Sequence, residues 1–285
     1  MKLITFEHEG RVKAGCLAGD EVTVCDDGPD ASGWVLGRVR AGDAGPFTAI
    51  TRLPRADVRL LAPIPEPRRD ILCVGKNYYA HAAEFFGSGF DSSAREEVPS
   101  NPVVFSKAMT SVVGPGAVVK ASLDPTGSVD YEGELGVVIG KKAQRVKKAD
   151  AYDHVYGYVI VNDVTSRELQ KKHNQWVIGK GVDTFCPMGP WIATADEIGD
   201  VDAMELVTTV NGEERQRAIV KDMVFDIPTL IETLTATGTL LPGDIIATGT
   251  PAGVGIGFTP PKYLKAGDSM CVTITGLGTL ENPVE

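Results

Sequence analysis

Three acidic residues stand on alternate positions in the stretch VDYEGELGVVIG, residues 129–140: Asp130, Glu132 and Glu134. Residues two apart in a β-strand project from the same face, so these carboxylates would line one face while apolar residues line the other. One interpretation is an ordinary half-buried strand whose acidic face meets solvent. The other is a cation site, because clustered carboxylates repel one another unless a cation lies among them.

A fourth carboxylate favours the cation site. The apolar run HVYGYVIV leads into Asn162 and Asp163, so Asp163 would lie at the end of a buried strand, a poor place for a residue that only aids solubility. If the two strands are neighbours, Asp163 meets Glu132 and Glu134. Carboxylate oxygens select a hard divalent cation over zinc or copper. We therefore predict one Mg²⁺ (or Mn²⁺ or Ca²⁺) per subunit, with coordination positions left for water and a chelating substrate.

An acid–base pair is a second candidate. His81 and Glu84 lie three residues apart in YYAHAAEF, and a helix would place both on one face. The same spacing is also typical of a surface histidine and glutamate. Residues 87–101, which follow, have no apolar periodicity, so they are expected to form a lid over substrate or to be disordered.

The bulk composition excludes several classes of protein. A formal charge of −10, from 28 basic and 38 acidic residues among 285, disfavours nucleic acid and anionic membrane surfaces as partners. No apolar run approaches the roughly 20 residues that span a bilayer. The first residues, MKLITFEHEG, are charged too early for a secretory signal, and the five scattered cysteines lack a C-x-x-C pair. We expect a soluble, cytoplasmic protein.

The elements that must position these residues are mostly strands. Residues 1–62 contain short β-like runs and predict a small β-rich N-terminal domain, which the proline-rich APIPEPRRD separates from a catalytic domain at 63–285. Helical periodicity is convincing only in SRELQKKHNQW and DIPTLIETLTATG. The latter has Asp226 as N-cap, Pro228 in its first turn and Gly238 at its end. Many strands and few helices predict an α+β, β-rich fold.

Five segments in order resemble the fumarylacetoacetate hydrolase family, especially its bacterial acylpyruvate hydrolase, decarboxylase and isomerase branches. They are GKNYYAHAAE, FSK, YEGELGVVIG, NDVTSRELQ…GKGVDTFCPMGP and PGDIIATGTPAGVG, and the resemblance begins near Ile71. It implies the family's mixed β-sheet roll, a homodimer, and Glu132, Glu134 and Asp163 as metal ligands. The vertebrate-type hydrolase has a larger, different N-terminal domain and an extra aspartate near its metal, where this chain has Asn77.

The resemblance also implies roles for other residues. His81 would be the general base and Glu84 its orienting partner, while Lys180 would contact substrate oxygens. Lys180 alone could be a surface lysine, but Val177 and Ile178 beside it indicate a partly buried stretch. Three residues would bind substrate: Gln170, Thr250 and Lys107. For Lys107 a structural role is equally expected.

These assignments predict hydrolysis of a C–C bond in a β-diketo acid of the acylpyruvate or fumarylpyruvate type. The substrate's carboxylate and 2-oxo groups would chelate the metal, which stabilises the enolate leaving group while His81 activates water. Without that water, the same chelate predicts a decarboxylase or isomerase of small 2-oxo or 2-hydroxydienoic diacids, such as oxaloacetate, 2-hydroxyhepta-2,4-diene-1,7-dioate or 5-carboxymethyl-2-hydroxymuconate, in aromatic catabolism. A non-catalytic metal-binding scaffold is a third alternative, which the acid–base pair disfavours.

Overall fold

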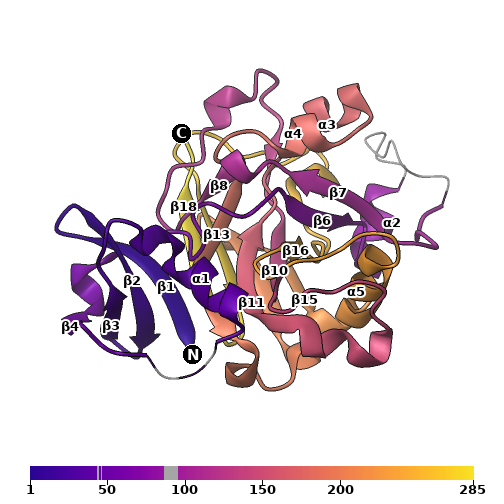
Figure 1. Ribbon diagram of the computed structural model, residues 1–285. Helices are drawn as coiled ribbons and strands as arrows, with labels where there is room; N and C mark the ends of the chain where they lie inside the picture. Colours follow the sequence, from indigo (N-terminus) through magenta and orange to yellow (C-terminus); the bar gives the residue numbers. More distant parts are fainter. Residues whose placement is uncertain (44, 46, 87–95) are drawn as a thin grey trace.

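The computed structural model describes residues 1–43, 45, 47–86 and 96–285 (Figure 1). Most of the predicted lid, residues 87–95, lies outside the described residues, and that prediction stays untested. Strands dominate the described chain and helices are few and short, which confirms the α+β, β-rich prediction. None of the described helices has the length and apolar character needed to cross a membrane.

One twelve-stranded sheet forms the centre of the molecule. Its strands, in spatial order, are β4 (Thr51–Pro54), β3 (Glu21–Asp26), β2 (Arg11–Ala18), β1 (Lys2–His8), β13 (Cys186–Thr194), β11 (Val155–Asn162), β10 (Gly133–Ile139), β16 (Ile245–Ala247), β6 (Ile71–Gly75) and β7 (Val103–Lys107). β5 (Arg59–Leu60) pairs with β1, and β8 (Val112–Val113) pairs with β13. β6 runs parallel to β16 and β8 parallel to β13, while the other pairings in the described part of this sheet are antiparallel.

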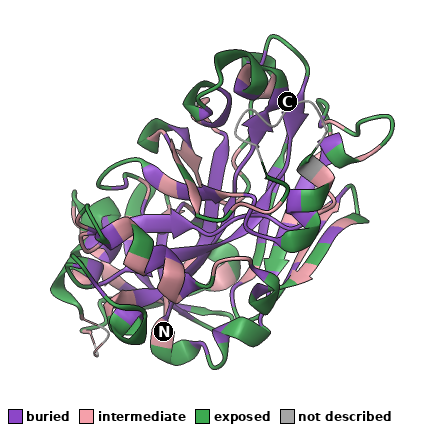
Figure 2. Ribbon diagram, turned by 90° about the vertical axis from the view of Figure 1, so that its right-hand side faces the viewer, coloured by how far each residue is buried: buried purple, intermediate pink, exposed green. Residues whose placement is uncertain are grey.

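Two smaller sheets and five α-helices complete the fold. The four-stranded sheet runs β15 (Glu213–Ile219), β14 (Glu205–Val210), β17 (Ser269–Ile274) and β18 (Gly278–Pro283), and β9 (Val129–Asp130) pairs with β12 (Thr165–Ser166). The α-helices are α1 (Trp34–Ala41), α2 (Tyr79–Phe85), α3 (Arg167–His173), α4 (Val177–Lys180) and α5 (Ile227–Thr235). Figure 2 shows that the central strands are buried, whereas helices and loops at the periphery expose much of their surface.

The N-terminal strands are continuous with the rest of the sheet. β1 pairs antiparallel with β13, with Lys2 opposite Ala193 and Leu3 opposite Ile192. In Figure 1 the indigo strands β1–β4 extend the sheet away from β11 and β10. The N-terminal region is therefore joined to the remainder by strand pairing as well as by the proline-rich segment.

The cap of α5 confirms the sequence prediction in detail. The Asp226 carboxylate accepts a hydrogen bond from the Thr229 N–H at 2.8 Å, and proline occupies the first turn. The helix ends at Thr235, however, three residues before Gly238, which was predicted to lie at its end. Leu230 and Ile231 face the core, so burial of one helix face stabilises this amphipathic element.

The interpretation of residues 129–140 as one continuous, half-buried strand is wrong. The chain leaves strand geometry at Tyr131 and Glu132, which separates β9 from β10 and puts these two strands in different sheets. All seven residues of β10 are buried, because β11 and β16 flank it and other elements cover both faces. The alternating carboxylates therefore lie inside the protein, and the solvent-exposed acidic face is excluded.

Candidate metal centre and active site

The edge between β10 and β11 brings the three predicted metal ligands together. Glu134 lies opposite Val161, and the Asp163 N–H, just beyond β11, donates to the Glu132 carbonyl at 2.8 Å. The Asn162 side-chain oxygen accepts from the Glu132 N–H at 3.0 Å and fixes the backbone where β9 and β10 separate. Carboxylate oxygens of Glu132, Glu134 and Asp163 all lie within 4.8 Å of one another, and all three residues are buried.

Three cationic side chains surround two of these carboxylates. The Lys180 ammonium, at the end of α4, lies 2.7 Å from Glu132 Oε2 and 2.7 Å from Asp163 Oδ2. The Arg167 guanidinium, at the start of α3, lies 2.6 Å from Glu132 Oε1, and Lys107 lies 2.7 Å from Asp163 Oδ1. These contacts pair both carboxylates with positive charge and fix their orientation.

Glu134 has a different electrostatic environment. Its Oε2 accepts the Gly249 N–H at 2.9 Å, and no lysine or arginine in the described chain forms an ion pair with it. Burial and the neighbouring charges of Asp163 and Glu132 raise the pKa of Glu134 well above its ordinary value. For Glu132, burial also acts upward, but the cations of Lys180 and Arg167 outweigh it and lower the pKa to about 2.

The donor set fits a hard divalent cation. Its three ligands are all carboxylate oxygens, which Mg²⁺, Mn²⁺ and Ca²⁺ prefer, and they converge from two adjacent segments. Glu134 supports this assignment, because burial and two neighbouring carboxylates raise its pKa and no lysine or arginine in the described chain forms an ion pair with it. Glu132, Glu134 and Asp163 would therefore hold the cation, and its charge would favour the ionised form of Glu134.

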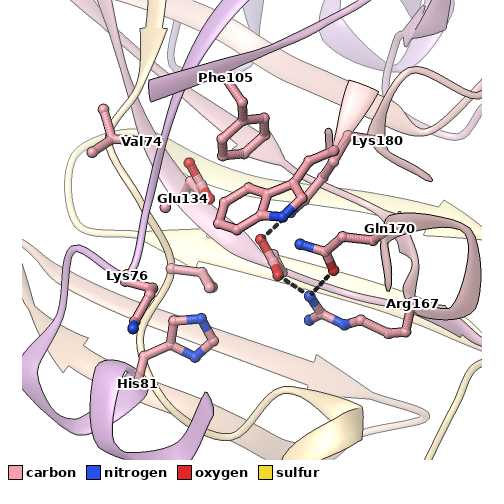
Figure 3. A pocket seen from close by; sticks show the side chains of 12 residues that line it. Val74, Lys76, His81, Phe105, Glu134, Arg167, Gln170 and Lys180 are labelled. Atoms are coloured by element: carbon pink, nitrogen blue, oxygen red, sulfur yellow. Dashed lines mark hydrogen bonds and ion pairs between the residues drawn. The ribbon is translucent and has the colours of Figure 1, made fainter. Parts of the chain in front are cut away.

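A pocket opens beside the carboxylates (Figure 3). In this view Lys76 and His81 lie on one side of the pocket, below Glu134, and Arg167 and Gln170 lie on the other side. A small molecule in this pocket would thus contact the carboxylate cluster, a histidine and several cations at once.

The predicted acid–base pair lies at this pocket. His81 is only 4% exposed and lines the pocket, so the surface-histidine alternative is excluded. Its Nδ1 lies 3.2 Å from Glu84 Oε2, one helical turn away on α2. Glu84 Oε1 accepts the Gly253 N–H at 3.0 Å, which fixes the carboxylate from the opposite side. The imidazole is thereby oriented to exchange a proton with a bound molecule.

Two of the predicted substrate-binding residues line the pocket. Gln170 Oε1 accepts from Arg167 Nη1 at 3.3 Å, which directs its amide group. Thr250 also lines the pocket, but its hydroxyl donates to the Gly133 carbonyl at 3.0 Å and accepts from Gln216 Nε2 at 2.8 Å. The Thr250 hydroxyl therefore already has a donor and an acceptor partner within the protein.

Lys107 occupies a different position. It is fully buried and is not among the described residues that line the pocket. Its ammonium donates to the Val164 carbonyl at 2.9 Å and to the Lys180 carbonyl, in addition to its ion pair with Asp163. These contacts favour the structural role, in which Lys107 holds Asp163 and the end of α4 in place.

Sequence reasoning missed several residues of the pocket. Arg167 lies three residues before Gln170 on α3, so the spacing argument used for His81 and Glu84 could have found it. Lys76 has a left-handed backbone (φ 56°) between β6 and α2 and is only 3% exposed. Phe105 and Trp176 form an edge-to-face pair with ring centroids 5.1 Å apart, an aromatic wall that a single sequence does not reveal.

The fold and this site can be compared with known proteins. The profile described as fumarylacetoacetate (FAA) hydrolase C-terminal matches residues 70–285. The chain belongs to the fumarylacetoacetate hydrolase family. A second profile, Rv2993c-like N-terminal, matches residues 1–63. The predicted family and its fold are thus confirmed.

Three members of this family show how its activities differ. Oxaloacetate tautomerase YisK of Bacillus subtilis is 51% identical over 229 residues, which cover 80% of this chain and 74% of that protein. The structure of a fumarylacetoacetate hydrolase from Exiguobacterium antarcticum matches with a TM-score of 0.85 and 39% identity, covering 100% and 99% of the two chains. The structure of maleylpyruvate hydrolase from Sphingobium sp. SYK-6, in complex with manganese(II) ion and pyruvate, matches with a TM-score of 0.77 and 31% identity. The match covers 100% of this chain and 98% of that chain. The chain is therefore an enzyme-family member whose relatives include tautomerases and hydrolases.

Proposed function

We propose that the protein is a divalent-metal-dependent enzyme that moves a proton on a small 2-oxo diacid of the oxaloacetate type, interconverting its keto and enol forms. The observation that carries the proposal is the His81–Glu84 pair at 3.2 Å, in the pocket that Glu132 and Glu134 also line. The 51% identity to an oxaloacetate tautomerase supports this reaction over the hydrolysis that the sequence motifs predicted first.

The chain's own residues account for the proton transfer. A cation held by Glu132, Glu134 and Asp163 would act as a Lewis acid that stabilises the enolate form of a 2-oxo acid. His81 would remove a proton from the carbon next to the 2-oxo group, while Glu84 keeps the imidazole oriented and balances its positive charge. The 2-oxo oxygen would then take up a proton from water to give the enol, and His81 would return its proton to water, so that no net proton is gained or lost. The ammonium of Lys180 would stabilise negative charge on the 2-oxo oxygen.

The charge of the pocket supports a diacid. Lys76, Arg167 and Lys180 all line the pocket, so positive charge is available for both carboxylates of a diacid. Lys76 lines the side that holds His81, away from Arg167 (Figure 3). We propose that one substrate carboxylate lies at the metal and Arg167, and that the second lies near Lys76.

Hydrolysis of a β-diketo acid is the second candidate. The same His81–Glu84 pair could activate a water for attack on a distal carbonyl, and the 31% identical maleylpyruvate hydrolase shares the fold. Decarboxylation needs the same chelate and no water. The three reactions differ in their products, so they are separable by one assay.

The working state of the protein is part of the proposal. We propose one Mg²⁺ or Mn²⁺ per subunit, a homodimer as implied by the family resemblance, and a cytoplasmic location. The five cysteines are all free thiols, which suits a reducing compartment. Light scattering at several concentrations tests the dimer.

The function is tested with Mn²⁺-loaded protein and a panel of oxaloacetate, an acylpyruvate and a longer dienoic diacid. Ultraviolet absorbance follows loss of the enol, and proton NMR in D₂O identifies exchange at C3 and any product. We expect enol–keto exchange of oxaloacetate faster than in buffer and without net loss of carbon. Cleavage of the acylpyruvate with no effect on oxaloacetate would instead establish the hydrolase. Metal binding with no turnover of any compound would establish the scaffold.

A further inference from the structure

Asp130 is the acidic residue of the alternating stretch that the metal centre does not use. It is fully buried, yet it is not one of the three clustered ligands and does not line the pocket. Its carboxylate accepts four hydrogen bonds. Oδ1 accepts from the N–H groups of Tyr131 at 2.9 Å and Gly255 at 2.6 Å, and Oδ2 accepts from Arg167 Nε at 2.8 Å and the Ile256 N–H at 3.0 Å.

Asp130 is connected to the carboxylate cluster through Arg167. Asp130 holds Arg167 at Nε, and the same guanidinium contacts Glu132 Oε1 through Nη1 at 2.6 Å. Because a guanidinium is planar and rigid, fixing Nε also fixes the direction in which Nη1 points. Nη1 additionally donates to Gln170, so Asp130 determines how Arg167 is presented to both the carboxylate cluster and the pocket.

Asp130 is connected to Glu84 through the backbone segment that contains Gly255 and Ile256. Gly255 and Ile256 begin a short 3₁₀ turn, and two residues earlier the Gly253 N–H donates to Glu84 at 3.0 Å. The turn ends at Gly257, where a Cβ atom would lie 2.0 Å from Glu84 Oε1, so the backbone there packs directly against that carboxylate. The segment that Asp130 binds is therefore the segment that positions Glu84.

The geometry points to Asp130 as a positioning residue that couples the two halves of the site. Its carboxylate holds Arg167 toward the metal ligands and, through residues 253–257, holds Glu84 toward His81. This inference rests on the proposed function for the roles of His81 and Glu84. The coupling itself is a structural property and can be measured without turnover.

The test substitutes Asp130→Asn in the full-length protein, with Asp124→Asn as the matched control. An amide nitrogen cannot accept a hydrogen bond, so asparagine leaves two of the four donors facing another donor. Asp124 is also buried and accepts from the Ser128 N–H at 2.7 Å and the Ser166 hydroxyl at 2.9 Å, but it touches neither Arg167 nor residues 253–257 in the described hydrogen bonds and ion pairs.

Two NMR readouts report on the two halves. In Asp130→Asn we expect the Arg167 Nε–H signal to lose its protection from solvent exchange. The amide of Gly253, which is not a partner of Asp130, should exchange about tenfold faster or more, since hydrogen bonds to charged groups are strong. Both should stay protected in Asp124→Asn. Unchanged exchange at Gly253, or an equal increase at amides throughout β10 and β11, would overturn the coupling. If Asp130→Asn does not fold, Asp130→Glu is measured in the same way. It keeps the charge but displaces the carboxylate, and unchanged exchange at Gly253 again overturns the inference.

Kinetics supply an independent arm once a substrate is in hand. We expect Asp130→Asn to lower kcat about 10- to 100-fold, as loss of supporting contacts around a metal site commonly does. In a Glu84→Gln background Asp130→Asn should lower kcat by a much smaller factor, because the Glu84 carboxylate that Asp130 helps to position is already absent. Additive losses would contradict the coupling. Absence of turnover in the wild type would refute the proposed function and leave the NMR test intact.

Discussion

Lys180 offers the sharpest test of the electrostatic account. Its ammonium lies 2.7 Å from both Glu132 Oε2 and Asp163 Oδ2, and all three residues are buried. Although burial acts to lower it, these two carboxylates raise the pKa of Lys180 above its ordinary value. Lys180→Met keeps a similar apolar stem and removes the charge. Breaking a buried ion pair by removing one partner costs about 3–5 kcal/mol, so the metal-free variant should be destabilised by that amount.

The same substitution should strengthen metal binding. A divalent cation must share Glu132 and Asp163 with the Lys180 ammonium in the wild type, whereas in Lys180→Met the carboxylate cluster carries one positive charge fewer. We expect at least about tenfold tighter Mn²⁺ binding, which corresponds to about 1.4 kcal/mol. The added stability from a fixed excess of Mn²⁺ should therefore be larger in the variant than in the wild type.

The assay is urea denaturation with and without Mn²⁺, followed by circular dichroism. Lys262→Met is the control, because Lys262 forms an exposed ion pair with Glu213 at 2.9 Å and such pairs contribute at most about 1 kcal/mol. If metal-free Lys180→Met were as stable as the metal-free wild type, the buried ion-pair network would be refuted. Weaker stabilisation by Mn²⁺ in the variant would refute the shared binding of these carboxylates by ammonium and metal.

Three further predictions follow from the site. Burial acts to raise the pKa of Asp124, but hydroxyl and N–H donors of residues 126, 128 and 166 outweigh it and lower the pKa below its ordinary 3.8. The stability that the ionised Asp124 contributes to the fold is therefore full above that pH and is lost as the pH falls. Asp124→Asn should thus cost about 1–3 kcal/mol in urea denaturation at neutral pH and much less in acid; an equal cost at both would contradict this. His81→Gln should retain Mn²⁺ affinity by calorimetry but lose turnover, and lost affinity would remove His81 from the acid–base role. Lys76→Met should raise KM for a 2-oxo diacid by about tenfold or more while leaving a 2-oxo monoacid nearly unchanged, consistent with loss of one charge-assisted contact; equal effects on both would exclude the second-carboxylate site.

The clustering of Glu132, Glu134 and Asp163 could be predicted because their positions follow from strand pairing. Glu132 and Glu134 flank the start of β10, and Asp163 follows the antiparallel strand β11 that pairs with it. Residue type and spacing predicted the cluster only on the condition that the two strands are neighbours, and the family resemblance supplied that condition. Asp130 was not separable from these residues, because its different role depends on the break in the chain after β9.

Burial around Lys180 shows where local sequence fails. Val177 and Ile178 suggested a partly buried stretch, yet they are 40% and 50% exposed, while Lys180 itself is 2% exposed. α4 is a four-residue helix, and the face it buries is chosen by ion pairs to distant carboxylates and by contact with Phe105 on β7. Such contacts join residues far apart in the chain and leave no periodic pattern for a single sequence to display.

The central claim is that one hard divalent cation binds among Glu132, Glu134 and Asp163. Its most direct test is an anomalous difference map, recorded at the manganese absorption edge from crystals soaked in Mn²⁺. We expect one strong peak per chain within bonding distance of a carboxylate oxygen from each of the three residues. A map with no peak there at saturating Mn²⁺, or with manganese bound only elsewhere, would contradict the account.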